Sequence, residues 1–456
     1  MASMIAFVLA CAAFAVLAFV RHPLYGLYFY FASIYVHPPS RWWGPMLPDL
    51  RWALTSALIT ALAIMFHRGR LAAKPPWYAN GIAILLISYA SWMVIQSAWA
   101  LDLATHLDGT VKFIKYLIAF WFVYRISDTK ETIREVQFGH VLGCGLLGSY
   151  AMMVGRDGDR LDGVGGPGLD DANTLGMYLA TGLVMGLALV LTYRNWRRWA
   201  LLGVLGVIAT GFVLANSRGA FLGLVAGGLV VMMTKAKAHR RMFWVLAIVG
   251  MIGFAVVVDK TFIERMFTIS DVAKTSEDAD ASARSRVIIY QAQLKMFFDH
   301  PMGAGHRSTA TLSPHYLDSR WLTTQGGGDT AVAQRSSHNT FMTTLVEQGI
   351  VGSLLFIGML LWLFRAILRL RRVAGHPEVD PDVVTMGGAL AGALAVVIVA
   401  GSATDYLLAE VQFWLFAALV STLQLAEAPS RRVAPAPASG EPDARRGGAL
   451  SGAQLR

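Results

Sequence analysis

The chain has little charge and almost no cysteine. Only 15% of its 456 residues are charged, 55% are hydrophobic, and the mean hydropathy is +0.51. A soluble domain carries about 25% charged residues, and a soluble core of this size would leave too much apolar surface in water. The two cysteines, Cys11 and Cys144, lie in apolar stretches and indicate neither a disulfide nor a metal site. The composition therefore indicates a protein whose solvent is lipid.

Signatures of soluble catalysis are also missing, because nothing in the sequence resembles a zinc site, a phosphate-binding loop or a serine nucleophile elbow. The net charge of +10 does not indicate nucleic-acid binding, since the basic residues form short clusters between apolar stretches. Such clusters orient membrane proteins, with the basic connections in the cytoplasm.

Apolar stretches recur along most of the chain, and a bilayer span takes about 20 apolar residues. These stretches must be helical, because lipid cannot satisfy exposed backbone groups. The stretch at 24–36 is short and flanked by prolines, so it can be half inserted. The sequence therefore predicts an all-α polytopic membrane protein with about 12 transmembrane helices. The stretches are 4–20, 24–36, 52–66, 80–100, 111–126, 136–154, 173–193, 199–215, 219–234, 241–259, 339–368, 384–402 and 406–425.

The basic clusters fall in alternate connections, which places those connections in the cytoplasm. They are Arg68/Arg70/Lys74, Arg125/Lys130/Arg134, Arg194/Arg197/Arg198, Lys235/Lys237/Arg240/Arg241 and Arg365/Arg369/Arg371/Arg372. The remaining connections are expected to face outward: 37–51, 101–112, 155–172, 215–219, 260–337 and 403–405. The sequence divides into N-terminal transmembrane helices (1–259), a large periplasmic loop (260–337), C-terminal transmembrane helices (338–426) and a disordered cytoplasmic tail (427–456).

The loop at 260–337 is longer than a passive link requires, and long ordered loops are often functional. Apolar residues from Val287 to Phe298 have the spacing of an amphipathic helix. Pro301 is expected to end this helix, and Gly303-Ala304-Gly305 to form a turn. Gln325 to Asp329 is expected to be a flexible tip.

Three arginines are candidates for binding an anion. Arg218 lies between two apolar stretches at the outer face, where a charge is costly without a partner; the alternative is that it reaches the lipid headgroups. Arg284 and Arg286 lie near the start of the loop helix, where guanidinium groups beside a helix N-terminus can bind an anion. A solvated basic face is the alternative for this pair.

His338 and Asn339 stand where the loop re-enters the membrane. The positive end of a helix dipole favours a neutral imidazole, which can accept a proton near pH 7. A structural histidine is the alternative.

Four further polar residues lie at outward positions. Asp171 and Asn173 can hydrogen-bond sugar hydroxyls, although Asp171 can equally cap a helix. Lys112 and Lys115, at the outer end of a span, can hold a phosphate or simply reach the headgroups.

Two closely spaced acidic pairs, Asp157/Asp159 and Asp278/Asp280, have the spacing of a metal-binding carboxylate pair. Both lie in polar segments, so we interpret them as solvated loop charges and expect no metal.

Four segments, taken in order, resemble the O-antigen ligase and polymerase superfamily. They are Asn216-Ser217-Arg218-Gly219, Arg286 with Pro301 and Gly303-Ala304-Gly305, His338-Asn339, and Glu347-Gln348-Gly349-Ile350. The resemblance covers residues 170–425 in order and spacing. The segments 23–38 and 166–173 look like a ligase subgroup associated with exported-glycan systems, so the chain is most like an O-antigen ligase. The resemblance implies an all-helical, GT-C-like fold in the bacterial inner membrane, with an active site that faces the periplasm.

The resemblance also implies a glycosyltransferase. Its members move a glycan from undecaprenyl pyrophosphate to an acceptor hydroxyl, with inversion and without a metal or other cofactor. In a ligase the acceptor is a sugar of lipid A–core; an O-antigen polymerase or a protein O-oligosaccharyltransferase uses a glycan or a protein instead. We expect Arg218 and Arg286 to neutralise the pyrophosphate and His338 to act as general base. We expect Arg284, Asn339, Asp171, Asn173, Lys112 and Lys115 to bind substrate. The expected partners are the two lipid-linked substrates and membrane lipids, with no nucleic acid, and the expected state is a monomer.

Glu347 lies nine residues after His338, half a turn out of phase on an ideal helix, so it is expected to serve structure rather than orient His338. A transporter of lipid-linked glycans is the competing class. It would place charges near the middle of the spans and show inverted repeats, whereas here the charges collect at the outer edge.

Overall fold

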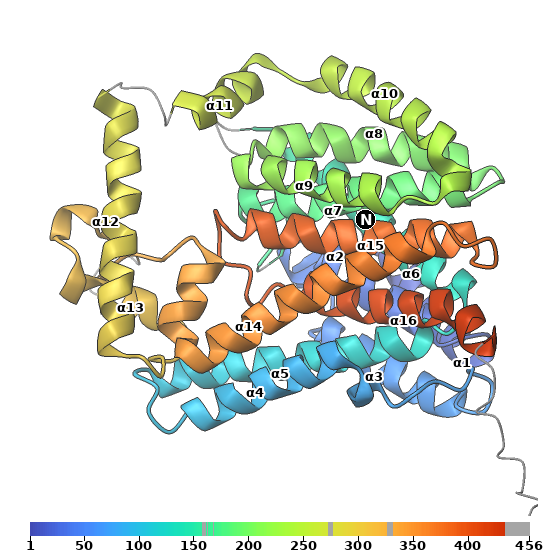
Figure 1. Ribbon diagram of the computed structural model, residues 1–456, viewed down its shortest axis with the longest axis horizontal. Coiled ribbons are helices and arrows are strands. Elements are labelled where there is room, and N and C mark those ends of the chain that lie inside the picture. The colour runs from blue at the N-terminus through green and yellow to red at the C-terminus, as the bar shows by residue number, and fades with distance from the viewer. Residues whose placement is uncertain (157–160, 162, 167, 272–276, 326–331, 434–456) are drawn as a thin grey trace, which may run out of the picture.

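The computed structural model describes residues 1–156, 161, 163–166, 168–271, 277–325 and 332–433, of which 267–271, 277–286, 324–325, 332 and 428–433 are described by their backbone alone. The described residues form a bundle of roughly antiparallel α-helices, with a smaller group of elements at one end (Figure 1). The helices before the loop are α1 (Ala2–Val20), α2 (Leu24–Val36), α3 (Trp52–Phe66), α4 (Gly81–Gln96), α5 (Leu103–Ile126), α6 (Lys130–Val154), α7 (Ala172–Thr192), α8 (Arg197–Ala215), α9 (Arg218–Thr234) and α10 (Arg240–Val257).

The remaining elements belong to the loop and to the C-terminal part of the bundle. They are α11 (Lys260–Asp271), α12 (Glu277–Asp299), α13 (Ser308–Tyr316), the strands β1 (Thr323–Gln325) and β2 (Val332–Gln334), α14 (Thr340–Val373), α15 (Pro381–Ala400) and α16 (Glu410–Val433). The strands pair antiparallel, with Thr324 opposite Ala333. Residues 326–331, which include most of the expected tip, lie outside the described residues.

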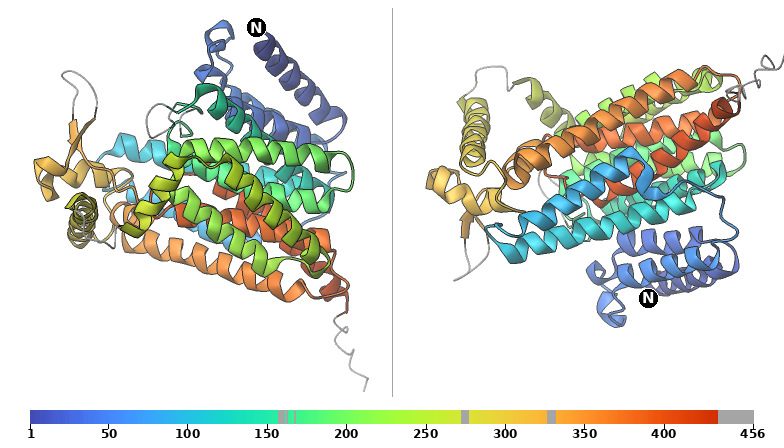
Figure 2. Two further views of the ribbon diagram at one scale, coloured as in Figure 1. Left: turned by 90° about the horizontal axis from the view of Figure 1, so that it is seen from above. Right: turned by 60° about the horizontal axis from the view of Figure 1, so that its bottom comes forward.

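Helices α7 and α15 form the centre of the bundle. About nine-tenths of each is buried (89%), compared with 17% of α1 and 6% of α10. Glycines let α9 and α15 approach closely, since a Cβ on Gly223 or Gly227 would lie 2.8 Å from a carbonyl oxygen of α15. Small residues at helix contacts are typical of membrane bundles. Helices α1 to α3 pack together along one flank (Figure 2).

Among the described residues, six helices are long and apolar enough to cross a membrane: α1, α7, α8, α14, α15 and the stretch 237–257 containing α10. Helices α3, α4 and α9 are shorter but also apolar. These helices support the predicted all-α membrane protein. The expected twelve spans stay a prediction. Helix α16 continues to Val433, past the expected boundary at 426, and residues 434–456 lie outside the described residues.

The connections predicted to face outward meet at one end of the bundle. Arg41 donates to the carbonyl oxygen of Val164 (3.1 Å), and the N–H of Leu101 donates to Ala304 (3.0 Å). Asn339 donates to the carbonyl oxygen of Ser402 (3.2 Å). The first two bonds each join two of these connections, and the third joins residues just outside two of them, so these segments lie together at one end.

The basic connections meet at the opposite end. Lys130 forms an ion pair with Asp380 (2.6 Å), and Arg197 pairs with Glu135 (2.7 Å). Lys74 donates to the carbonyl oxygen of Tyr124 (2.6 Å), and burial lowers the pKa of Lys74 to about 7. The basic connections therefore lie together at this end of the bundle.

The amphipathic helix predicted in the loop is present within α12, which ends at Asp299, two residues before Pro301. Its apolar face, with Ile289 and Met296, packs against Leu312 of α13 and Val346 of α14 in a small core of its own. This second core fixes α12 and α13 at the end of the bundle (Figure 1).

Two predicted spans differ from the observed helices. Helix α5 begins at Leu103 instead of 111, because Asp102 caps it by accepting from the N–H of Thr105 (3.1 Å). Helix α14 is interrupted at Gly349, where φ is 65° and ψ is −163°. It therefore consists of a short segment before Gly349 and a long segment after it, which meet at an angle (Figure 1).

Candidate functional site

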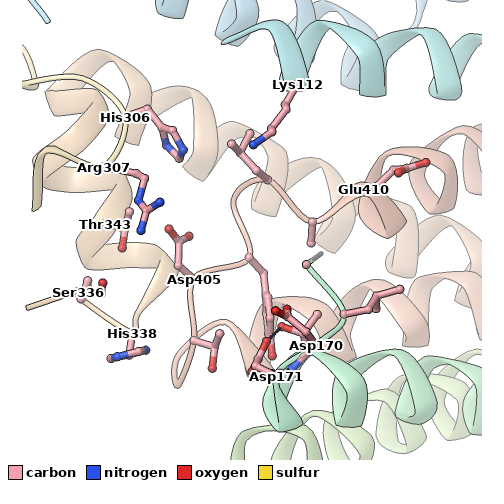
Figure 3. A pocket seen from close by; sticks show the side chains of 18 of the residues that line it. Lys112, Asp170, Asp171, His306, Arg307, Ser336, His338, Thr343, Asp405 and Glu410 are labelled. Carbon is pink, nitrogen blue, oxygen red and sulfur yellow. Dashed lines mark hydrogen bonds between the residues drawn. The ribbon is translucent and has the colours of Figure 1, made fainter. Parts of the chain in front are cut away.

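A cavity of about 740 Å³ lies at the end of the bundle that carries the loop. Its walls come from the start of α7, the residues after the Gly-rich turn, the chain on either side of the start of α14, and the α15–α16 connection. Ile34 of α2 and Lys112 and Tyr116 of α5 also line it. Segments from the N-terminal helices, the loop and the C-terminal helices therefore share one space (Figure 3).

His338 lines this cavity immediately before α14. Its φ of 50° is in the left-handed region, which is uncommon for a residue with a side chain, and its side chain is exposed to the cavity. The following residues hold the backbone in place, since the N–H of Thr340 donates to Gly401 (2.7 Å). The predicted base thus lies at a solvent-accessible position on a fixed backbone.

The predicted Gly-rich turn is also confirmed, and it delivers two residues that the sequence did not single out. Gly303 and Gly305 have φ values of 80° and 97°, a conformation that glycine adopts at low cost. The turn is tied to α14, because the N–H of Gly305 donates to the carbonyl oxygen of Glu347 (3.0 Å). It is followed directly by His306 and Arg307, which both line the cavity.

Carboxylates line the cavity as well. Asp405 lies in the α15–α16 connection, on the same side as Arg307 and Thr343 (Figure 3). Its side chain is open to the cavity, yet desolvation by the surrounding protein, and secondly the charge of Glu347, raise its pKa to about 6. Glu410, the first residue of α16, accepts a hydrogen bond from Tyr30 (2.6 Å). The cavity therefore presents both acids and bases to a ligand.

Asp171 and Asn173 lie at the start of α7, and Asp171 lines the cavity. The helix-capping alternative is confirmed for Asp171, which accepts from the N–H groups of Asn173 (2.9 Å) and Thr174 (3.2 Å). Asn173 accepts from the hydroxyl of Ser217 (2.9 Å), the residue before Arg218. Arg218 opens α9 and is partly buried, and it is not among the residues that line the cavity. Asn173 therefore couples the cap of α7 to the backbone that carries Arg218.

Asn339 has a structural role in the observed fold. Its side chain caps α14 by accepting from Phe341 (2.9 Å) and Met342 (3.1 Å), and it donates to the hydroxyl of Tyr290 (3.2 Å). These contacts use both ends of its amide, so substrate binding by Asn339 would require breaking the cap.

The two lysines of α5 are separated by the structure. Lys112 lines the cavity and pairs with Asp108 (2.6 Å), with about half of its side chain exposed (49%). Lys115 is exposed and is not among the lining residues. An exposed pair of this kind contributes little to stability, so Lys112 can exchange its partner for a ligand.

Arg284 and Arg286 lie on α12, but their side chains are outside the described part of the chain, as are the side chains of Asp278 and Asp280. Asp157 and Asp159 are also outside it. Within the described residues, no three His, Cys, Asp or Glu side chains are grouped as metal ligands would be.

A comparison with protein families matches residues 204–357 to the family described as O-antigen ligase. A comparison with curated proteins gives no match. The O-antigen ligase family region runs from α8 to the long segment of α14 and includes Arg218, Arg286 and His338.

The O-antigen ligase family region supplies only part of the cavity wall. His306, Arg307 and Glu347 lie within it, whereas Asp405 and Lys112 lie outside it. Sequence reasoning missed His306 and Arg307 although both follow the predicted Gly turn, which was a usable signal. It also missed Asp405, an acid in the short outward connection at 403–405. The raised pKa of Asp405 depends on burial and on the nearby Glu347, and therefore on the fold.

Proposed function

We propose that the protein is an O-antigen ligase that transfers a glycan from undecaprenyl pyrophosphate to a sugar hydroxyl of lipid A–core. Transfer inverts the anomeric centre and uses no metal. The observation that carries this proposal is that the family region contains His338, which lines a 740 Å³ cavity at the loop end of the bundle. The cavity has room for parts of both substrates.

The chemistry needs a proton acceptor and a means of stabilising the leaving group. As the acceptor oxygen forms its bond to C1, its proton passes to the imidazole of His338 and the bond from C1 to the phosphate oxygen breaks with its electron pair. Arg218 and Arg286 then neutralise the charge that develops on the pyrophosphate. Asn173 supports this arrangement through Ser217, the residue next to Arg218.

We further propose that the loop end of the bundle faces the periplasm of the bacterial inner membrane. The basic end, with Lys74, Lys130 and Arg197, would lie in the cytoplasm. In this orientation the division into N-terminal helices, periplasmic loop and C-terminal helices applies, with about twelve helices in the membrane. Both lipid-linked substrates would then reach the cavity from the outer leaflet.

The test is transfer in vitro with purified protein, undecaprenyl-pyrophosphate glycan and lipid A–core. General acid–base catalysis is worth roughly 10²- to 10⁴-fold, so His338→Ala should reduce the rate by at least 100-fold, and Arg218→Ala should also abolish efficient transfer. His315→Ala, on the exposed part of α13, is the matched control and should retain activity.

Parallel reactions offer a glycan or a protein as acceptor, and one contains EDTA. Transfer only to a glycan would make the enzyme a polymerase, and transfer only to protein would make it a protein O-oligosaccharyltransferase. Loss of activity with EDTA would refute the metal-free mechanism. If the protein moved the lipid-linked glycan across liposome membranes without transferring it to any acceptor, the protein would be a transporter rather than an enzyme.

A further inference from the structure

His306 and Glu347 form a pair in the wall of the cavity. The Nδ1 of His306 lies 3.3 Å from the Oε2 of Glu347, and the two side chains are only 14% and 4% exposed. Both atoms are shielded from water, and neither has a hydrogen-bond partner within the described part of the chain, so the pair is a close electrostatic contact rather than an aligned hydrogen bond. The carboxylate and the ring nitrogen are therefore each other's available partners.

The backbone on both sides holds this pair in place. The N–H of His306 donates to the Nδ1 of His106 (2.9 Å), while the Nε2 of His106 bonds the carbonyl oxygen of Met93 (2.7 Å). The N–H of Gly305 donates to the carbonyl oxygen of Glu347 (3.0 Å). The imidazole of His306 is thus fixed relative to the carboxylate before any ligand arrives.

This geometry sets what the other nitrogen of the His306 ring can do. A carboxylate beside Nδ1 favours the tautomer in which Nδ1 carries the proton, so that Nε2 keeps its lone pair. His306 lines the cavity, and its ring is turned toward it (Figure 3). In this tautomer Nε2 can accept a hydrogen bond from a hydroxyl group.

The neighbouring groups favour the same class of ligand. Besides desolvation, the charge of Glu347 raises the pKa of Asp405, whereas His306 and Arg307 lower it and so favour the charged carboxylate. Thr343 lies one turn before Glu347 on the same face of α14, is only 2% exposed, and lines the cavity with a hydroxyl that has no partner among the described residues. This wall offers a hydroxyl group and acidic side chains rather than an excess of positive charge.

We propose that His306, Glu347 and Thr343 form the subsite that binds a hydroxyl group of the acceptor sugar, with Glu347 as the positioning residue for His306. The inference rests on the proposed function and deepens it, because it assigns the acceptor to the α13–α14 wall. The pyrophosphate of the donor then lies at a distance from this wall, so that the carboxylates of the wall do not repel it. His338 remains the group that takes the proton.

Two variants test the subsite. His306→Phe keeps an aromatic ring but removes both nitrogens, and Thr343→Val removes the hydroxyl while keeping the shape. The loss of one neutral hydrogen bond should raise the KM for lipid A–core about three- to tenfold, with the KM for the glycan donor unchanged. His315→Phe, on the exposed end of α13, is the control and should leave both KM values unchanged.

Stability separates recognition from a structural role. Thr343→Val removes a buried hydroxyl without a partner, so its Tm should equal or exceed that of the wild type while its acceptor KM rises. Unchanged acceptor KM values in both variants would overturn the subsite, as would a rise in the donor KM that matches the rise for the acceptor.

Direct binding keeps the two proposals distinguishable. Purified lipid A–core is titrated against the wild type and both variants in the absence of donor. If the wild type transfers glycan to no acceptor, the proposed function fails. The subsite would still be supported if the two variants bound lipid A–core more weakly than His315→Phe does. Equal binding by all three would overturn it.

Discussion

Gly349 interrupts α14 in a backbone conformation that only glycine adopts readily, with φ of 65° and ψ of −163°. A Cβ at this position would overlap the backbone of Met302 and Gly303 and would lie 2.6 Å from the carbonyl oxygen of Pro301. Since these neighbours are backbone atoms, they cannot move aside as a flexible side chain would. We therefore expect Gly349→Ala to push α14 away from the Gly-rich turn.

The cost of Gly349→Ala follows from two contributions. The unfavourable backbone conformation costs about 1–3 kcal/mol. Separation would also weaken the backbone hydrogen bonds from Ala304, Gly305 and Ile350 across this contact, each worth about 1 kcal/mol. The sum of about 4–6 kcal/mol is a large part of the stability of an ordinary domain, which is about 5–15 kcal/mol.

Thermal unfolding of purified protein in detergent measures this effect. We expect the Tm of Gly349→Ala to fall by about 4–6 °C, and glycan transfer to be lost because His306 moves with the turn. Gly206→Ala on α8 is the matched control, since nothing lies within 4 Å of its added Cβ, and alanine in a helix is favoured by up to about 1 kcal/mol over glycine. If the two variants melted at the same temperature, the contact between α14 and the turn would not be a source of stability.

Three further predictions concern charged groups of the cavity. Because the pKa of Asp405 in the folded state is raised to about 6, the protein loses stability as the pH rises through this value. Asp405→Asn should therefore raise the Tm more at pH 7.5 than at pH 4.5. An equal change in Tm at both pH values would contradict this prediction. Asp171→Ala should lower stability by about 1 kcal/mol through loss of the α7 cap, whereas Asp171→Asn should retain it; denaturant unfolding measures both, and equal losses would show that the cap does not matter. Lys112→Ala should raise the KM for the glycan donor and Lys115→Ala should not, because only Lys112 lines the cavity; steady-state kinetics with both variants decides this, and equal effects would argue against direct binding.

Features that depend on a local pattern could be predicted from the sequence. The apolar stretch at 173–193 became α7 at Ala172–Thr192, and the stretch at 24–36 became α2 with the same bounds, because burial or lipid dictates a helix in each case. The helix before Pro301 and the turn at Gly303 were also found, since proline and glycine act on the chain locally.

Features that depend on distant contacts could not be predicted. The interruption at Gly349 requires the backbone of Pro301–Gly303 as its neighbour, so Glu347-Gln348-Gly349-Ile350 alone gives no sign of it. The prediction that Glu347 would not orient His338 rested on an ideal helix. In the structure Glu347 faces His306 instead and also lines the cavity, so its expected role as a purely structural residue stays open to test.

The walls of the cavity differ in how firmly their functional groups are held, and this difference has a consequence for catalysis. His306 is fixed by a hydrogen bond of its own backbone N–H and by a turn whose N–H groups donate to α14. Lys112 extends from α5 with half of its side chain exposed. Fixed groups lose little freedom when a substrate binds, whereas an exposed lysine must be ordered at a cost in entropy. The rigid wall therefore suits the orientation of an attacking hydroxyl, and the mobile cation suits a charged lipid-linked group whose position varies as it enters.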